Sequence, residues 1–256
     1  EKKEESFRKK EKRKTTMTEL NLEFEVENPE LPLEVDRTGL SFFKASVKNY
    51  SSEWFEELYT KKKSVIKTYS WSFFLPEARF GTETIRIRGN KFFISFSDAN
   101  MAELLKFYNA FSLMKNKSHP MNKNSMKLVA IKAQNLQEIK DTEIIIKMQS
   151  SLIVRKHNSE DNTDIYYTCE DAEFPSMVKE NLRVFLEKLN INMDISNFSI
   201  TPLKGKKVVS KVMSRYTDQS IGIYKLTGNP ELLNLLYAAG LGSRRSEAHG
   251  KFSVLF

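Results

Sequence analysis

The sequence predicts an α+β protein built from two successive β-α-β-β-α-β units. Three observations support this fold class. Apolar and polar residues alternate strictly in several short segments, as they do in half-buried strands. Other segments repeat their apolar residues every three or four positions, as on one face of a helix. The order of these segments in the first half of the chain recurs in the second half.

The first unit opens with a strand followed by a helix. The apolar residues of this strand are Leu20, Leu22, Phe24 and Val26. Asp36 is suited to cap a helix that runs to about Asn49, and a shorter helix is expected at Glu53–Tyr59. A basic turn, Lys61–Lys63, follows the second helix.

Three strands, a helix and a last strand complete the first unit. The three strands are expected at Thr68–Leu75, Thr82–Arg88 and Lys91–Ser97. Asp98 is then suited to cap a helix with helically spaced apolar residues, and Met114–Met126 is expected to be a flexible loop. With a strand at Met126–Ala133, and with the first of the three strands set aside as an extension, the order is that of a ferredoxin-like, or RRM-like, domain.

The same order is expected in the second unit. Its predicted elements are strands at Thr142–Met148 and Ser151–Arg155, an extended piece at Asp164–Thr168, a helix starting at Asp171, strands at Lys206–Arg215 and Ser220–Leu226, a helix at Glu231–Ala239 and a strand at Lys251–Leu255. We therefore expect two tandem ferredoxin-like domains, at residues 17–134 and 135–256. A charged tail or linker, residues 1–16, precedes them.

Composition narrows the class of protein. The net charge of +8 favours a polyanionic partner, because neutralised phosphates release counterions, although a solvated lysine-rich surface is the alternative. The chain has no run of about 18 apolar residues, so we expect no membrane span. Its charged N-terminus is unlike a secretory signal, and the single cysteine, Cys169, cannot form an internal disulfide. These features predict a cytoplasmic protein.

Several classes of chemistry lack support in the sequence. The three histidines, His119, His157 and His249, are far apart in the chain, and no Cys-x-x-Cys pair occurs. The chain also has neither a GxxxxGK[ST] phosphate loop nor a GxSxG nucleophile motif. We therefore expect no metal, no cofactor, no nucleotide hydrolysis and no serine nucleophile.

The segment at residues 240–250 is the strongest candidate for a binding site. Glycines permit close approach of the backbone, and consecutive N–H groups can form an anion-binding nest. Guanidinium groups match phosphate oxygens. The candidate residues in this loop are Gly240, Gly242, Ser243, Arg244, Arg245, His249 and Gly250. In the alternative interpretation the three glycines serve only a helix end, a turn and a bulge.

Further basic residues are candidates for contact with a nucleic-acid backbone. They are Arg37, Arg155, Lys204, Lys206, Lys207, Lys211 and Arg215. Lys207, Lys211 and Arg215 are spaced to face one side of a regular strand, although a merely solvated strand face explains them equally well. Trp71 is expected in the core, whereas Trp54 is either a core residue or a base-stacking one.

The C-terminal segment resembles the glycine-rich loop of the CRISPR repeat-processing endoribonucleases of the RAMP (repeat-associated mysterious protein) superfamily. Gly240-Leu241-Gly242 matches the first part of the family pattern, and Ser243–Glu247 supplies five residues that include arginine. Ala248-His249-Gly250 departs from the last part, since Ala248 stands where glycine is usual. Other family-like segments are Leu20–Val26, Leu31–Leu33, Ser151–Arg155 and Pro202–Val208.

The resemblance implies tandem ferredoxin-like domains, CRISPR repeat RNA or crRNA as the partner, and a metal-independent cut that releases guide RNAs. In this reaction a ribose 2′-OH attacks the adjacent phosphate, which leaves a 2′,3′-cyclic phosphate and a 5′-OH. The reaction needs a base for the 2′-OH, a group that stabilises the charge of the phosphorane, and an acid for the leaving 5′-oxygen. DNA lacks the 2′-OH and is not a substrate.

The general base is the main departure from the family, because many members carry a histidine in or just after the first helix. Residues 36–70 contain no histidine, and the candidates there are Lys44, Lys48, Tyr59 and Lys67. Three explanations compete. A lysine or tyrosine acts as the base in place of histidine, or the protein binds RNA without cutting it. In the third, an engineered change removed a histidine, with Ala45 as one possible position. The competing functions are a non-catalytic RAMP subunit of a CRISPR effector complex, partnered by other subunits, and the RNA-processing domain of a larger fusion.

Overall fold

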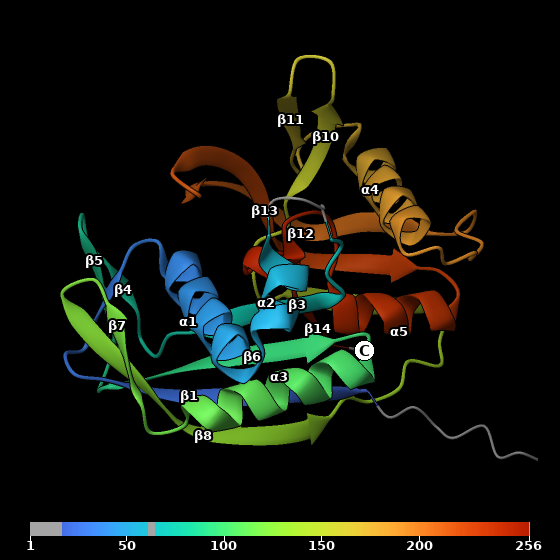
Figure 1. Ribbon diagram of the computed structural model, residues 1–256. Coiled ribbons are helices and arrows are strands. Elements are labelled where there is room, and N and C mark those ends of the chain that lie inside the picture. Colours follow the sequence, from blue (N-terminus) through green and yellow to red (C-terminus); the bar gives the residue numbers. More distant parts are fainter. Residues whose placement is uncertain (1–16, 61–64, 256) are drawn as a thin grey trace, which may run out of the picture.

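The structure is a computed structural model that describes residues 17–60 and 65–255. The expected charged tail at residues 1–16 and the expected basic turn at 61–63 lie outside these ranges. The described chain forms two larger antiparallel sheets with helices packed on them, and two smaller sheets of two and three strands (Figure 1). No helix in these ranges is long and apolar enough to cross a membrane.

The first sheet has the strand order β3-β6-β1-β8-β7. Its strands are β1 (Thr18–Val26), β3 (Tyr69–Phe74), β6 (Lys91–Asp98), β7 (Ser118–Met121) and β8 (Asn124–Asn135). The helices of this half are α1 (Val35–Tyr50), α2 (Ser52–Tyr59) and α3 (Met101–Met114). The alternation that predicted β1 reflects its fully buried face, which includes Leu22 and Phe24. Without the edge strand β7, the order is that of a ferredoxin-like domain.

The second sheet repeats this order as β12-β13-β9-β14. Its strands are β9 (Glu143–Met148), β12 (Ser199–Val212), β13 (Arg215–Thr227) and β14 (Phe252–Val254), and its helices are α4 (Phe174–Lys188) and α5 (Pro230–Ala239). A separate hairpin, β10 (Val154–Asn158) with β11 (Thr163–Tyr167), precedes α4. The predicted fold of two tandem ferredoxin-like domains is therefore confirmed, whereas the division of the chain at residue 134 stays a proposal.

The middle one of the three strands expected before α3, not the first, lies outside the main sheet. Thr84–Arg86 forms β5, which pairs with β2 (Glu30–Pro32) and β4 (Arg79–Phe80) in a small separate sheet. Tyr69–Phe74, by contrast, is the edge strand β3 of the main sheet. The large side chains of Tyr69 and Trp71 explain this placement, because both are buried in the core.

Two further expectations about boundaries are wrong. The predicted strand Lys206–Arg215 begins earlier, at Ser199, and it is interrupted by a turn at Met213 and Ser214, whose φ angles of 47° and 69° reverse the chain. Arg215 therefore belongs to the next strand and cannot share a strand face with Lys207 and Lys211. The predicted loop at Met114–Met126 contains β7, which pairs with β8.

Helix caps also differ from expectation. Asp98 ends β6 and accepts a hydrogen bond from Thr68 Oγ1, and the side chain of Asn100 caps α3 in its place. Asp36 lies in the first turn of α1, and Asp171 precedes α4. Asparagine and aspartate cap helices equally well, so sequence alone does not decide between neighbours of this kind.

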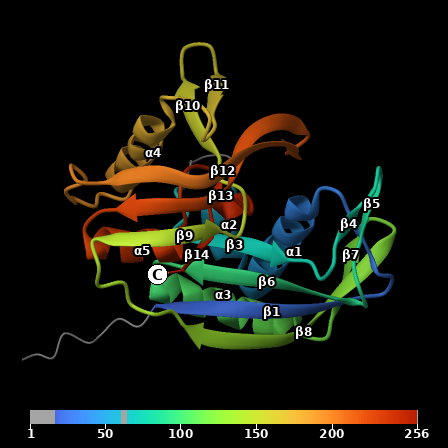
Figure 2. The ribbon, with the colours of Figure 1, turned by 180° about the vertical axis from the view of Figure 1, so that it is seen from behind.

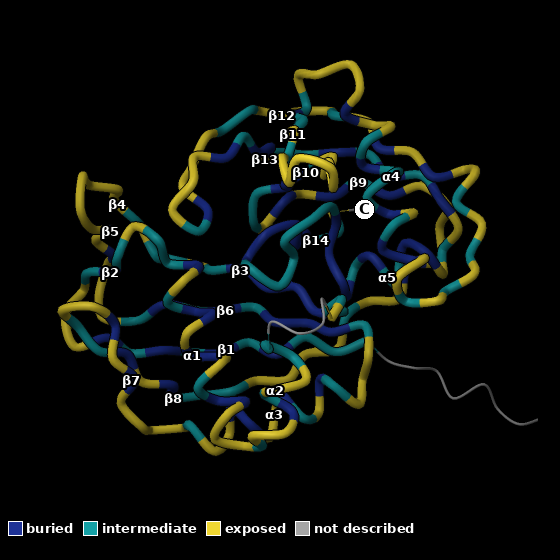
Figure 3. Tube along the Cα trace, turned by 45° about the horizontal axis from the view of Figure 1, so that its top comes forward, coloured by how far each residue is buried: buried dark blue, intermediate teal, exposed yellow. Residues whose placement is uncertain are grey.

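The two halves pack together where α5 ends and the glycine loop begins. Ser70 Oγ and Ser97 Oγ both donate hydrogen bonds to the carbonyl oxygen of Ala238, at 3.2 and 2.8 Å. Seen from behind, the second sheet lies above the first (Figure 2). The backbone of β3 and β6 is buried along this junction, whereas the tip of the β10–β11 hairpin is exposed (Figure 3).

Candidate functional site

Each glycine of the 240–250 loop has a structural reason to be glycine. Gly240, Gly242 and Gly250 have φ angles of 81°, 68° and 74°, which lie in the left-handed region. A Cβ atom on Gly242 would lie 2.4 Å from the carbonyl oxygen of Ile153, and one on Gly250 would lie 1.9 Å from that of Leu241. The glycines thus allow the loop to fold tightly against its own base and against β10.

Several backbone amides of this loop are used within the fold. The N–H groups of Leu241, Ser243 and Gly250 donate to the carbonyl oxygens of Gly250, Ile153 and Ser151, each at 2.8 Å. These groups cannot also form the anion-binding nest that the sequence suggested.

The two arginines of the loop differ in their surroundings. Arg244 forms an ion pair with Glu247 at 2.9 Å; burial opposes its charge, but Glu247 holds the pKa above its ordinary value. Arg245 places its guanidinium carbon 3.5 Å from the ring centroid of Phe185, and burial lowers its pKa to about 10. Both arginines remain cations near neutral pH.

The end of the loop is buried. His249 is 6 % exposed, and its Nδ1 atom lies 3.0 Å from Ser151 Oγ. Burial lowers its pKa to about 4, so the ring is neutral near pH 7 and faces the protein rather than solvent. Ala248 has a φ angle of 67°, which explains why glycine would suit this position.

A cavity of about 270 Å³ connects the glycine loop with the first half of the chain. Its walls come from α1, the end of α2, the approach to β3, the tip of the β12–β13 hairpin and the loop itself. The residues with polar side chains that line it are Lys44, Tyr59, Thr60, Lys67, Ser246 and Glu247. Three of the four candidate catalytic residues therefore meet in one place.

Two ammonium groups flank one aromatic ring in this cavity. The Nζ atoms of Lys44 and Lys67 lie 5.5 and 5.0 Å from the ring centroid of Tyr59. Burial lowers the pKa of Lys67, Glu247 raises it and the charge of Lys44 lowers it, with a net decrease. Burial raises the pKa of Tyr59 to about 12, so its hydroxyl stays protonated. Lys67 is thus the side chain best suited to accept a proton.

Residues 133–254 match the family model described as CRISPR associated protein Cas6, C-terminal. This C-terminal half belongs to the Cas6 family. The match spans the glycine loop, β10–β11 and the whole second sheet, and it confirms the CRISPR-associated RAMP family that the loop pattern suggested.

Solved structures extend the Cas6 fold over nearly the whole chain. A RAMP protein that binds different RNA substrates is 18 % identical, with a TM-score of 0.79 over 93 % of this chain and 100 % of that one. A Cas6-related protein from Pyrococcus furiosus is 15 % identical, with a TM-score of 0.80 over 93 % and 98 %. A Cas6 product complex is 13 % identical, with a TM-score of 0.70 over 93 % and 100 %. No curated protein matches the chain.

Lys48, the fourth catalytic candidate, lies outside the cavity that holds the other three. Its Nζ atom is 5.8 Å from the ring centroid of Phe55, one helical turn beyond Lys44. Ala45 lies on the same helix and is half-buried, but it does not line the cavity either.

The basic residues of the β12–β13 hairpin are spread over a long exposed arm rather than gathered at the cavity. Lys204, Lys206 and Lys211 are exposed, and Lys207 forms an ion pair with Asp218 at 2.7 Å. Arg215 begins β13 and is also exposed. Only the tip approaches the cavity: Ser214 Oγ accepts a hydrogen bond from Arg37 Nη1 at 3.3 Å, and Met213 lines the wall.

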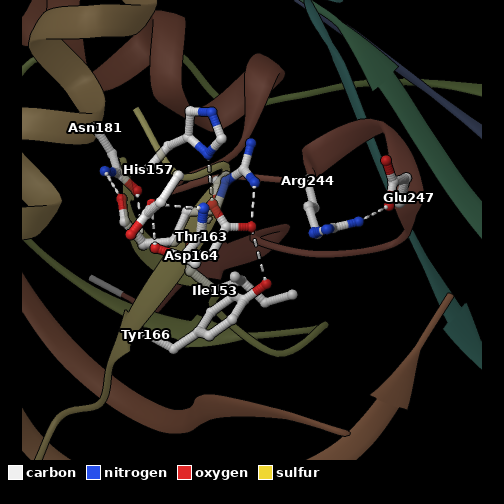
Figure 4. A network of polar contacts seen from close by, with 11 residues as sticks. Ile153, His157, Thr163, Asp164, Tyr166, Asn181, Arg244 and Glu247 are labelled. Carbon is white, nitrogen blue, oxygen red and sulfur yellow. Dashed lines mark hydrogen bonds and ion pairs between the residues drawn. The ribbon is translucent and has the colours of Figure 1, made fainter. Parts of the chain in front are cut away.

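Arg155 contacts Asp164, which lies in a polar network on the β10–β11 hairpin together with His157 and Tyr166 (Figure 4). Its Nη1 atom lies 2.7 Å from Asp164 Oδ2, and His157 Nδ1 lies 2.9 Å from Asp164 Oδ1. Burial alone would raise the pKa of Asp164, but the hydrogen bonds from His157 and Arg155 hold it below its ordinary value. Asp164 therefore fixes the direction of both basic side chains.

Sequence reasoning missed the acidic partners of this site. Glu247 counted only as a spacer in the loop, yet it pairs with Arg244 and acts on Lys67. A signal was present, because Arg244 and Glu247 are three residues apart, the spacing of an ion pair on one helical turn. Asp164 gave no such signal, because its partners are on the opposite strand of a hairpin.

Proposed function

We propose that this protein is an endoribonuclease that binds CRISPR repeat RNA and cuts precursor transcripts without a metal ion. The observation that carries the proposal is the meeting of Lys44, Tyr59 and Lys67 with Ser246 and Glu247 of the glycine loop around one cavity. The Cas6 C-terminal match and the RNA-bound solved structures of the same fold support RNA as the substrate.

The chemistry requires a base with a lowered pKa. Lys67 Nζ, in its neutral form, removes the proton from the ribose 2′-OH, and the 2′-oxygen forms a bond to phosphorus as the bond to the 5′-oxygen breaks. The ammonium of Lys44 stabilises the charge of the phosphorane and gives a proton to the leaving 5′-oxygen. The products are a 2′,3′-cyclic phosphate and a 5′-OH, and solvent exchange restores both lysines.

Tyr59 positions the two lysines in this scheme. Its ring lies within cation–π distance of both ammonium groups, and its hydroxyl lies 3.2 Å from the hydroxyl of Tyr69. Trp71 Nε1 donates to the carbonyl oxygen of Ser246 at 2.9 Å, which anchors the glycine loop over the core of the first half.

A cleavage assay in excess EDTA tests the proposal. We expect purified protein to cut a matching repeat RNA to a cyclic-phosphate end, and we expect K67A and K44A to lower the single-turnover rate by about 10²-fold or more. K48A is the matched control, since Lys48 lies on the same helix outside the cavity. Loss of activity in EDTA, or equal effects of K48A and K67A, would contradict the mechanism.

A non-catalytic RNA-binding subunit is the second candidate function. The observation that favours it is the placement of the three histidines, since none of them lines the cavity of Lys44 and Lys67. Tight binding of repeat RNA by the wild-type protein, with no cut over hours in either EDTA or Mg²⁺, would establish this function instead.

A further inference from the structure

A second, larger cavity lies on the other side of the glycine loop from the Lys67 cavity. Its volume is about 780 Å³, and its walls are β10, α4, residues 242–245 of the loop, and Ile66 next to Lys67. Arg244 and Arg245 belong to this cavity, whereas Ser246 and Glu247 line the first one. The glycine loop thus forms a partition between two sites.

The lining of this second cavity is strongly basic. Its cationic side chains are Arg155, Lys156, Lys188, Arg244 and Arg245, and its single carboxylate is that of Glu180. Arg183 lies 2.8 Å from Glu180 and offsets this negative charge. Within residues 17–60 and 65–255, neither Lys156 nor Lys188 takes part in an ion pair. Their ammonium groups are available to an external anion.

The walls are held in place before any ligand binds. The side chain of Asn181 on α4 accepts a hydrogen bond from the backbone N–H of Arg155 at 3.2 Å and donates one to its carbonyl oxygen at 2.7 Å. Asp164 fixes the guanidinium of Arg155 from behind. A preformed site binds more tightly than one that must be ordered on binding.

Part of the lining of this cavity is apolar. The guanidinium of Arg245 lies over the ring of Phe185, and Met177 and Val184 also line the cavity. A nucleobase stacks well on an arginine plane or an aromatic ring, whereas the phosphates on either side of the base require cations. The volume is in the range of sites that enclose one small ligand, so it admits one or two unpaired nucleotides but not a double helix.

We propose that this cavity binds an unpaired segment of the RNA substrate, with its phosphates held by Lys156 and Lys188 and a base stacked over Arg245. The proposal rests on the RNA-binding part of the proposed function but not on cleavage. Because the glycine loop separates the two cavities, a strand that crosses the loop reaches the Lys67 cavity with its backbone already held on one side.

Short probes test this assignment by fluorescence anisotropy. The probes are a labelled ten-nucleotide oligouridylate and a blunt RNA duplex, and the variant is K156A/K188A, which removes two exposed side chains. We expect about tenfold weaker binding of the oligouridylate and a slope of log Kd against log[salt] that is smaller by about 1.4, as for two lost phosphate contacts to a single strand. Binding of the duplex should change little.

The matched control is K123A/K127A, which removes the same charge from two exposed lysines at the β7–β8 hairpin. No binding of the oligouridylate by the wild-type protein, or equal losses in the two variants or for the two probes, would overturn the proposal. The wild-type protein could bind the oligouridylate in a way that depends on Lys156 and Lys188 and yet cut no RNA. That result would support RNA binding in this cavity and would contradict only the proposed cleavage.

Discussion

The Nζ atom of Lys251 lies 2.9 Å from Oε2 of Glu19, and this ion pair joins the residue after the glycine loop to the first strand of the other half. Lys251 is fully buried, and its Nζ atom also donates a hydrogen bond to Ser97 Oγ at 2.6 Å. Burial lowers the pKa of this lysine, and Glu19 opposes the decrease. The base of the loop is thus held to the first sheet by a charged contact inside the protein.

Removal of one partner should therefore be strongly destabilising. We expect K251M to lower the free energy of unfolding by about 3–5 kcal/mol, because it leaves the carboxylate of Glu19 without its partner, and we expect K251M/E19L to recover part of the loss. Urea denaturation followed by fluorescence measures both. K91M is the control, since Lys91 pairs with Glu23 at the surface, and a K251M effect no larger than that of K91M would show that the buried pair contributes little.

The rate of RNA cleavage should rise with pH as Lys67 loses its proton. The midpoint is expected below the ordinary lysine value, because burial and Lys44 lower the pKa of Lys67. Glu247 raises this pKa, so E247Q should move the midpoint of the pH–rate profile to lower pH. Single-turnover rates at saturating RNA measure it. E56Q is the control, because Glu56 is exposed on α2 and lies outside the cavity. A midpoint of the pH–rate profile that is the same in E247Q and wild type would argue against Lys67 as the base.

His249 should make the fold sensitive to acid. Its pKa is lowered from 6.5 to about 4 in the folded protein, so the unfolded chain binds the proton first as the pH falls. The contribution of neutral His249 to the free energy of unfolding is therefore fully present above pH 6.5. It is lost between pH 6.5 and 4, by about 3 kcal/mol in total at 1.36 kcal/mol per pH unit. Urea denaturation across this range should show a smaller decline for H249Q than for wild type, and equal declines would contradict the assignment.

Gly242 should tolerate a side chain less well than Gly89. Both have φ near 70°, which is strained by about 1 kcal/mol for alanine, but a Cβ atom on Gly89 meets nothing within 4 Å. A Cβ atom on Gly242 would lie 2.4 Å from the carbonyl oxygen of Ile153. We expect G242A to be more destabilising than G89A by roughly 2 kcal/mol or more, measured by thermal unfolding. Equal effects would mean that the loop adjusts without resistance.

Local patterns in the sequence were sufficient to predict most of the helices and strands and their order. Alternation identified β1, and helical spacing identified α3. These signals are local, because the pleat and the helical turn impose them within a few residues. The loop pattern at 240–250 is local too, since its glycines are required by left-handed backbone angles.

Turns without a local signal were not predictable. The reversal at Met213-Ser214 uses two residues at positive φ, where asparagine and glycine are usual, so the sequence gives no sign of it. In the folded protein, the hydrogen bond from Arg37 and the packing of Met213 in the cavity wall stabilise this turn. Its consequence was the wrong placement of Arg215 on one strand face with Lys207.

Which basic residues lie close together depends on how the two halves of the chain pack. Lys44, Lys67 and Glu247 come from segments up to about 200 positions apart, and packing of the glycine loop on the first half brings them to one cavity. The same packing separates them from Lys48, which looks equivalent in sequence. The sequence determines the sign of each charge. The pKa of Lys67 and the partners of Arg244 depend instead on burial and on distances, which are set when the two halves of the chain pack together.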